Sequence, residues 1–257
     1  MVLHKNTDGL LPVCVVIPTY NHAPFLEEVL NRCFSQSLPI IVINDGCTDQ
    51  TLSVIDQILQ NKPEEIPFVL VNFSKNRGKG SAIKAGAHKA LELGFHGMIT
   101  IDSDSQHNPE EIPLFLEQAL RTPDAIIIGS RGLSHENMPK KNTTANKISN
   151  FWFHFQTLTH LPDTQSGFRY YPLSCFKKII WFTDRYNFEL EVMVRNIWRG
   201  YSIIPIPITV YYPPEDVRIT HFKPTLDFLR ITVLNTFLSI AAILYYYPIK
   251  LIRTILK

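Results

Sequence analysis

The sequence predicts an α/β fold whose mostly parallel central sheet is covered by helices on both faces. Short runs rich in Val and Ile alternate with helical patterns through the first half of the chain. These runs are apolar at successive positions, as is typical of parallel strands that are buried between two layers of helices. With 257 residues and an ordinary charged and aromatic content, the chain can bury a substantial core.

The regular elements of the first half follow from apolar periodicity and from turn residues. Strands are expected at residues 13–18, 40–45, 68–72, 98–102 and 125–129. Helices are expected between them, at residues 24–36, 49–60, 80–93 and 109–120. This order is that of a parallel sheet with helical crossovers.

The second half has a looser pattern. Residues 132–146 are polar and predict a loop, residues 148–158 predict a helix, and residues 163–169 form another polar stretch. A further helix is expected at residues 188–199. The proline-bearing segment 201–212 predicts a strand at the edge of the sheet, because proline cannot donate to a neighbouring strand on both sides.

Polar residues cluster just after the predicted strands. They occupy positions 19–21, 44–46, 76–80, 102–106 and 130–131. Ligands of open parallel sheets bind beyond the carboxyl ends of the strands. The sequence therefore predicts the functional site at this edge.

The pair Asp102 and Asp104 is the most informative feature of that edge. In extended geometry their side chains share a face. Two carboxylates that close repel each other unless a cation lies between them or one is protonated. A divalent cation that takes few protein ligands and completes its shell with phosphate oxygens fits the pair. The alternative is an aspartate-rich turn before the Asn-Pro helix start at 108–109.

Other residues at this edge suit a phosphorylated nucleoside. The basic loop 74–80, which carries Lys79, could bind an anion at the start of a helix, or could be an ordinary helix-entry loop. Asp45 could bind a base or ribose, or could brace the Gly46 turn. Arg131 could bind phosphate through two hydrogen bonds, or could form a salt bridge. The chain lacks the G-x-G-x-x-G and P-loop spacings, which argues against a dehydrogenase-type dinucleotide site and an NTPase.

Six ordered motifs carry a family resemblance. They are Ile17-Pro-Thr-Tyr-Asn21, Ile43-Asn-Asp-Gly-Cys-Thr-Asp49, Asn76-Arg-Gly-Lys-Gly80, Asp102-Ser-Asp-Ser-Gln-His107, Gly129-Ser-Arg131 and Asp163-Thr-Gln-Ser-Gly-Phe-Arg169. Together they resemble the motifs of family 2 glycosyltransferases, most closely the dolichyl- or polyprenyl-phosphate sugar synthases. The resemblance covers residues 12–212, and six motifs in order are far more specific than one. His22 and Cys47 depart from the common pattern, which has Glu and Ser there.

The resemblance implies a GT-A fold over residues 1–215 and an inverting transfer of sugar from a UDP- or GDP-sugar. The acceptor would be lipid-linked or a glycan of the cell envelope. Asp102 and Asp104 would hold Mg2+ or Mn2+, with Gln106 nearby. By position, the donor-binding residues would be Pro18, Thr19, Tyr20, Asp45, Lys79, Asp102, Ser103 and Arg131.

Two carboxylates are candidates for a catalytic base, Glu189 and Asp163. A sugar hydroxyl acceptor would need such a base, whereas a phosphate monoester is already largely dianionic at neutral pH and needs none. Glu189 could instead be a helix N-terminal acid. Nearby Glu191 is expected to pair with Arg195, four residues later on the same helix.

The C-terminal segment 216–257 is both basic and apolar. From Val217 onward it holds six Lys or Arg residues and one acidic residue, a net charge of +5 that leaves −3 for the rest of the chain. Residues 231–249 are at the short edge of what spans a bilayer. We expect helices that associate with an anionic membrane surface rather than nucleic acid; the alternatives are packing on the core and a homo-oligomer.

The four cysteines are widely spaced and are expected to be reduced thiols of a cytoplasmic protein. This favours the inner face of the cytoplasmic membrane. Two other functions share parts of the pattern. One is a sugar-1-phosphate nucleotidyltransferase, whose Gly-rich, Arg-containing loop is absent here. The other is a non-catalytic nucleotide-sugar-binding protein, against which the intact aspartate pair argues.

Overall fold

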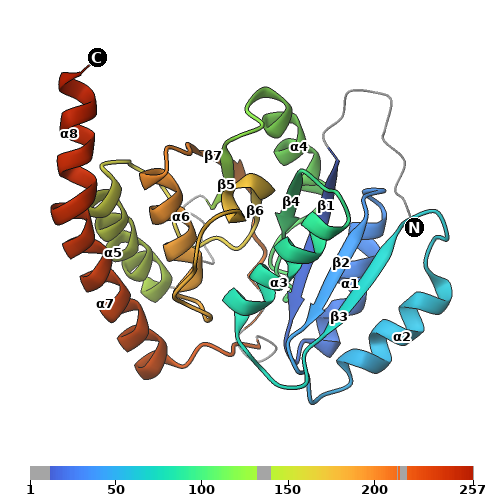
Figure 1. Cartoon of the computed structure of the whole chain (residues 1–257). Helices are drawn as coiled ribbons and strands as arrows, with labels where there is room; N and C mark the ends of the chain where they lie inside the picture. The colour runs from blue at the N-terminus through green and yellow to red at the C-terminus, as the bar shows by residue number, and fades with distance from the viewer. Residues whose placement is uncertain (1–11, 132–139, 213, 215–218, 257) are drawn as a thin grey trace.

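The computed structural model describes residues 12–131, 140–212, 214 and 219–256. A single sheet runs through these residues in the strand order β3-β2-β1-β4-β6-β5-β7. Figure 1 shows the sheet with helices on either side. The strands are β1 (Val13–Thr19), β2 (Ile40–Asn44), β3 (Phe68–Asn72), β4 (Gly97–Thr100), β5 (Ile126–Arg131), β6 (Arg169–Pro172) and β7 (Ile203–Ile208).

The sheet is mostly parallel, as predicted. β1 pairs in parallel with β2 and β4, β2 with β3, and β5 with β7. The five strands predicted in the first half are all present, and the proline-bearing β7 lies at the edge. β6 was not predicted: it pairs antiparallel to both β4 and β5 in the middle of the sheet. Four residues that end in Pro172 are too short to show a strand pattern.

Helices cover both faces of the sheet. They are α1 (Ala23–Phe34), α2 (Thr51–Asn61), α3 (Lys79–Glu92), α4 (Ile112–Arg121), α5 (Lys140–Thr157), α6 (Phe188–Trp198), α7 (Pro224–Ala241) and α8 (Tyr247–Ile255). Short 3-10 turns occur at Pro109–Glu111 and Leu173–Phe176, and a π-helical turn at Ala242–Tyr246 links α7 to α8.

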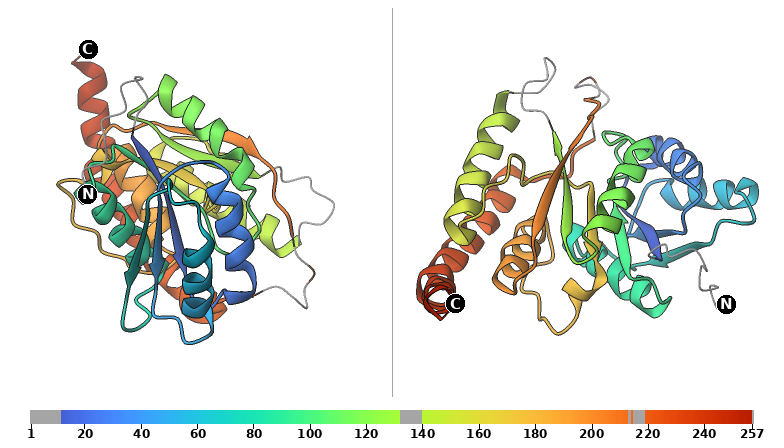
Figure 2. Two further views of the ribbon diagram at one scale, coloured as in Figure 1. Left: turned by 90° about the vertical axis from the view of Figure 1, so that its right-hand side faces the viewer. Right: turned by 90° about the horizontal axis from the view of Figure 1, so that it is seen from above.

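Side-chain alternation along β1 divides the core into two layers. Val15 and Ile17 pack with α1, α2 and α4, whereas Cys14 and Val16 pack with α3 and α6. Figure 2 shows α5 and the C-terminal helices as a further layer beyond α6. A strand with both faces buried this way reads as a continuous apolar run.

The prediction of a loop at residues 132–146 is wrong over the part of this range that the structure describes. Residues 140–146 are the first turns of α5, and residues 132–139 lie outside the described part. Polar tertiary contacts hold this half of α5: Asn146 Nδ2 donates to Asp163 Oδ1 at 2.9 Å, and Asn150 Nδ2 donates to the Pro162 carbonyl at 2.8 Å. Such contacts leave no apolar periodicity for sequence reasoning to find.

The C-terminal segment is helical, as predicted, over a longer stretch than its apolar run. In the described residues, Pro224–Ile255 is the one helix that is long and apolar enough to cross a membrane, by length and composition alone. Leu234 and Leu238 of α7 are buried in the core cluster that also holds Phe153 of α5. α8 has no buried residue and extends past the body of the protein (Figure 1).

Candidate functional site

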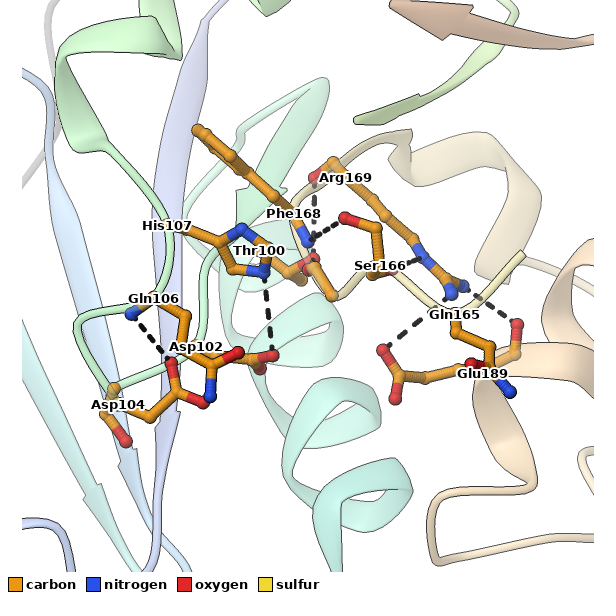
Figure 3. A network of polar contacts seen from close by, with 12 residues as sticks. Thr100, Asp102, Asp104, Gln106, His107, Gln165, Ser166, Phe168, Arg169 and Glu189 are labelled. Atoms are coloured by element: carbon orange, nitrogen blue, oxygen red, sulfur yellow. Dashed lines mark hydrogen bonds and ion pairs between the residues drawn. The ribbon is translucent and has the colours of Figure 1, made fainter. Parts of the chain in front are cut away.

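Three predicted site residues meet at the carboxyl edge of the sheet. Asp102 follows β4, Lys79 begins α3, and Glu189 lies in the first turn of α6. Lys79 Nζ lies 2.7 Å from Asp102 Oδ1 and 3.1 Å from Glu189 Oε2. One ammonium group therefore joins two carboxylates from distant parts of the chain. Figure 3 shows Asp102 and Glu189, which come from different elements, within one network of polar contacts.

The charges in this group depend on one another. Burial alone would lower the pKa of Lys79, but the Asp102 and Glu189 carboxylates outweigh burial and raise it. Burial alone would raise the pKa of Asp102, but the Lys79 ammonium outweighs it and lowers it. Gly167 closes over the pair, because a Cβ there would lie 2.3 Å from Asp102 Oδ2 and 2.8 Å from Lys79 Nζ. A side chain at this position would displace the carboxylate.

Asp104 has the surroundings of a cation ligand. Its Oδ1 accepts a hydrogen bond from the Gln106 N–H at 3.1 Å (Figure 3). Burial and the nearby Asp102 charge raise its pKa to about 6. Within the described residues no group of three or more His, Cys, Asp or Glu side chains could enclose a metal. A metal role for Asp102 and Asp104 stays a prediction; an ion there would need further ligands, such as phosphate oxygens.

Gln106 takes part in the site through its backbone. Besides its N–H bond to Asp104, its carbonyl accepts from the Tyr211 N–H at 2.9 Å. This ties the aspartate loop to the segment after β7. A ligand role for the Gln106 side chain stays a prediction.

His107 was quoted within a motif but given no role by sequence reasoning. Its ring is buried, lies 5.5 Å from the Phe168 ring, and places Nε2 3.9 Å from Asp102 Oδ2. Burial lowers the pKa of His107 to about 4, so its ring is neutral at pH 7. The position of His107 beside Asp102 depends on tertiary packing, and no local sequence pattern indicates it.

Ser103 and His22 form a hydrogen-bond chain beside the aspartates. Ser103 Oγ donates to the Pro18 carbonyl at 3.2 Å and lies 2.8 Å from His22 Nδ1. Both contacts are satisfied by the tautomer with the proton on Nδ1, in which His22 donates to Ser103 Oγ and Ser103 donates to the carbonyl. Burial and the neighbouring His221 lower the pKa of His22 to about 4. Its buried Nε2 is then an acceptor, and it has no partner in the described structure.

Thr19 is the last residue of β1, and Tyr20 follows it directly. Thr19 is buried, and its Oγ1 has no hydrogen-bond partner among the described residues. The Tyr20 ring meets the His221 ring edge-on at 4.9 Å. His221 therefore lies over both Tyr20 and His22, whose ring is 5.1 Å from it. The segment before α7 thus covers the position expected for a nucleoside.

Asp45 braces the loop before α3. It accepts hydrogen bonds from the backbone N–H groups of Arg77 at 2.6 Å and Gly78 at 2.8 Å, and from Asn76 Nδ2 at 3.1 Å. Burial raises the pKa of Asp45 in spite of these bonds. Gly46 allows the close approach: its φ is +70°, and a Cβ would lie 2.3 Å from the Lys75 carbonyl carbon. Contact between Asp45 and a donor stays a prediction.

Arg131 and Asp163 are paired with each other. Arg131 Nε lies 2.6 Å from Asp163 Oδ2, and a second guanidinium nitrogen lies 3.0 Å from Oδ1. The Asp163 side chain is fully buried, and Oδ1 also accepts from Asn146 and from the Gln165 N–H. Burial would raise the pKa of Asp163, but the Arg131 guanidinium outweighs it and lowers it. The Asp102 charge also contributes to the raised pKa of Arg131, so this pair is electrostatically linked to the Lys79 group.

Arg169 is a residue whose part in the site sequence reasoning missed. It is fully buried and donates to three backbone carbonyls, those of Ser166 at 2.6 Å, Thr164 at 3.1 Å and Glu189 at 2.8 Å. It therefore fixes the polar loop against the start of α6 (Figure 3). A buried arginine of this kind has no local sequence signal, because composition predicts an exposed one.

Glu191 pairs with Arg195 at 2.7 Å, which confirms the predicted helical pair. Glu191 is fully buried and also accepts from the N–H groups of Phe182 and Thr183. It thus fixes the segment that enters α6, and so the position of Glu189.

Comparison with known proteins identifies the family. Residues 14–180 match the model of Glycosyl transferase family 2. The chain belongs to this family. This glycosyltransferase is 30% identical over 203 residues to polyprenol monophosphomannose synthase of Mycolicibacterium smegmatis, and the match covers 76% of each chain. It is also 30% identical over 206 residues to undecaprenyl-phosphate mannosyltransferase of Micrococcus luteus, covering 77% of this chain and 82% of that one.

Solved structures share the fold of this glycosyltransferase. Glucosyl-3-phosphoglycerate synthase from Mycobacterium tuberculosis, in complex with Mn2+, UDP and glucosyl-3-phosphoglycerate, aligns with a TM-score of 0.57 at 16% identity, covering 92% of this chain and 79% of that one. A mannosyltransferase from Pyrobaculum calidifontis in complex with GDP-Man and Mn2+ aligns with a TM-score of 0.57 at 17% identity, covering 79% and 57%. The predicted GT-A fold and family resemblance are confirmed. The family match does not support the nucleotidyltransferase alternative.

Proposed function

We propose that this glycosyltransferase moves a sugar from a UDP- or GDP-sugar to a polyprenyl phosphate, with inversion at the anomeric carbon. The names of the two relatives, a polyprenol monophosphomannose synthase and an undecaprenyl-phosphate mannosyltransferase, support this acceptor. An oxygen of the acceptor phosphate would attack the anomeric carbon. The bond from that carbon to the donor diphosphate would break, and the nucleoside diphosphate would leave with the electron pair.

The main support for this proposal is that each of the two candidate bases forms an ion pair with a basic side chain. Asp163 is buried and bound by Arg131, and Glu189 is bound by Lys79 at 3.1 Å. The Arg131 guanidinium lowers the pKa of Asp163, which makes that carboxylate a poor proton acceptor. A phosphate monoester has a second pKa of about 6 and reaches the site already deprotonated. Because each candidate base already has a cation partner, we favour an acceptor that needs no base, and we propose positioning roles for Asp163 and Glu189 in place of the catalytic ones expected from the sequence.

Asp102 and Asp104 are the residues that would hold Mg2+ or Mn2+. When bound, such an ion neutralises charge that develops on the departing diphosphate. The solved complexes of similar fold carry Mn2+ with UDP or GDP-Man, which supports a divalent ion here. Lys79 lies beside Asp102, where its positive charge would stabilise the same leaving group.

The end of β1 would hold the donor nucleoside. Thr19 Oγ1 and His22 Nε2 are buried polar atoms without partners among the described residues, so a nucleoside could satisfy both. Tyr20 presents its ring beside them. Ser103 would act through His22, whose proton it positions. Arg131, held by Asp163, would lie toward the donor or acceptor phosphates.

We place the reaction at the inner face of the cytoplasmic membrane, in cell-envelope glycan synthesis. All four cysteines are unpaired, and three of them are buried, which is consistent with a reducing compartment. A polyprenyl phosphate is itself anchored in the bilayer, so the enzyme must work at a membrane surface. A glycan is the other candidate acceptor, and the experiment below also tests it.

The test is transfer to undecaprenyl phosphate in detergent, with UDP- and GDP-sugars and Mn2+ or Mg2+. We expect a lipid-extractable product and release of nucleoside diphosphate, both abolished by Asp104→Asn and by EDTA. Asp56→Asn, an exposed carboxylate of α2, is the control that should retain activity. Transfer to undecaprenol or to glycans but not to the phosphate would overturn the acceptor. Donor binding without turnover on any acceptor would overturn the enzymatic function.

A further inference from the structure

The C-terminal helix carries an exposed apolar surface along its whole length. On α7 the exposed apolar side chains recur every three or four residues, on the side away from the core. Five of them on α7, together with Leu244 of the following turn, lie on this side and are each at least half exposed: Leu226, Leu229, Val233, Phe237, Ile240 and Leu244. We call this set the outer stripe. Phe228 is also exposed but lies off this line. The buried residues of α7, such as Leu234 and Leu238, lie on the opposite side and contact the core.

The π-helical turn Ala242–Tyr246 continues the outer stripe onto α8. At 100° per residue, twelve residues of uninterrupted α-helix would turn Ile252 about 120° away from Ile240. A π turn takes up about one extra residue, which returns Ile252 to within roughly 30° of Ile240 by the same geometry. Ile252 and Ile255, which are 55% and 72% exposed, then extend the stripe.

The same turn places two tyrosines toward the core. Tyr246 Oη donates to the Thr157 carbonyl at 3.1 Å, and its ring stacks on Trp198. Tyr247 Oη donates to the Phe155 carbonyl. Without the extra residue, Tyr247 would point away from α5. These contacts show that the phase of α8 is set by the packing of the turn.

The cations of α8 lie off the stripe. By the same geometry Arg253 falls on the flank of the helix, whereas Lys250 falls on the side opposite the stripe, 5.6 Å from the Tyr246 ring. Helices that lie in the plane of a bilayer have an apolar face, with aromatic and basic side chains at the level of the headgroups. Basic residues next to the surface favour anionic lipid.

The inner side of α7 is incompatible with a simple span. Gln156 Nε2 of α5 donates to Asn235 Oδ1 at 2.9 Å and lies 3.3 Å from Ser239 Oγ, all buried between the two helices. A spanning helix would have to break this polar contact or draw α5 into the hydrocarbon. The helix is also long: 32 residues extend about 48 Å, against about 30 Å of hydrocarbon.

We propose that α7 and α8 dock in the plane of an anionic bilayer through the outer stripe, which the π turn keeps continuous. Phe182 extends this surface beyond the helix, because its exposed ring lies 6.0 Å from Phe237. The loop that carries Phe182 leads into α6 and Glu189, so the docked surface is linked to the site. This inference refines the membrane location within the proposed function, but lipid binding can be measured without the transfer reaction.

The first experiment is flotation of the full chain with vesicles of phosphatidylcholine alone or mixed with phosphatidylglycerol, which makes the surface anionic. We expect binding to the anionic vesicles, reduced at least tenfold by Ile240→Glu with Leu244→Glu. The matched control is Leu114→Glu with Leu120→Glu, two leucines of α4 that are 45% and 48% exposed. Equal binding by both double variants would overturn the proposal, and so would stripe-dependent dimerisation in place of lipid binding.

The second experiment measures depth. Single cysteines at Leu229, Ile240, Ile252 and Thr254, in a Cys47→Ser background, are labelled with an environment-sensitive dye. In-plane docking predicts a similar shallow depth for the first three positions and a water-exposed label at Thr254. A depth that increases from Leu229 to Ile240 and decreases again at Ile252 would show a span and overturn the proposal. A lipid-buried label at Thr254 would overturn the phase assigned to the π turn. Transferase activity enters neither readout.

Discussion

Lys79 Nζ lies within hydrogen-bonding distance of both oxygens of Asp102, at 2.7 Å and 3.0 Å. The same ammonium reaches Glu189. Asp102 is thus neutralised by this neighbouring ammonium. The arrangement leaves Asp104, with its raised pKa, as the carboxylate that gains most from a divalent ion.

Lys79→Met should destabilise the protein by about 3 kcal/mol, because it leaves the buried Glu189 and the partly exposed Asp102 without their cation. Urea denaturation at pH 7.5 measures the change. Mn2+ should restore more stability to the variant than it adds to the wild type, since the metal would replace part of the missing charge. Lys89→Met, which removes an exposed pair with Glu92, should cost under about 1 kcal/mol. Equal losses in the two variants would contradict this account.

Asp163→Asn should lower the stability of the protein rather than remove a catalytic base. The variant keeps the size of the side chain but leaves the buried Arg131 without a counter-charge, at a cost of about 3 kcal/mol. Activity should fall, while the pH dependence of kcat/KM keeps its shape. A variant as stable as the wild type that lacks the acidic limb of that profile would instead restore Asp163 as the base.

His22 gives the stability a dependence on pH. Its pKa is about 4 in the folded protein against an ordinary 6.5, so between these values the unfolded chain binds a proton that the folded chain does not. The free energy of unfolding should therefore fall as the pH drops from 7 to 4. We expect about 2 kcal/mol from this residue, less than the full linkage value because the ring is partly solvated.

Urea denaturation in EDTA at pH 7 and pH 4.5 checks the effect of His22. His22→Asn should show a smaller loss of stability on acidification than the wild type. His88→Asn, which changes an exposed histidine of α3, should behave as the wild type. The same acid-induced loss in all three proteins would show that other groups cause it.

Local patterns made most of the fold predictable. Val15 and Val16 face different helical layers, and their succession in a single apolar run signals a doubly covered strand. β6 and the first turns of α5 lacked such a signal, since pairing with β4 and β5 defines one and polar contacts to Asp163 hold the other. Their structure is determined by partners far away in the sequence.

The site shows the same division. The motifs placed Lys79, Asp102 and Arg131 at the right edge, because residues that follow parallel strands meet there. Which charged side chains form ion pairs with each other depends on the tertiary structure. Nothing near Glu189 in the sequence indicates Lys79 as its partner, and nothing near Asp163 indicates Arg131. The partners of these carboxylates could therefore be found only from the structure.

Glu189→Gln separates the two possible acceptors. The amide oxygen can still accept a hydrogen bond from Lys79, so the group around Asp102 should persist. With undecaprenyl phosphate as acceptor we expect kcat to stay within about tenfold of the wild type, since no proton has to be removed from the acceptor. Loss of a true general base would lower kcat by about 10²–10⁴. A fall of that size, in a variant with wild-type stability and donor affinity, would show that Glu189 takes a proton and that the acceptor is a hydroxyl.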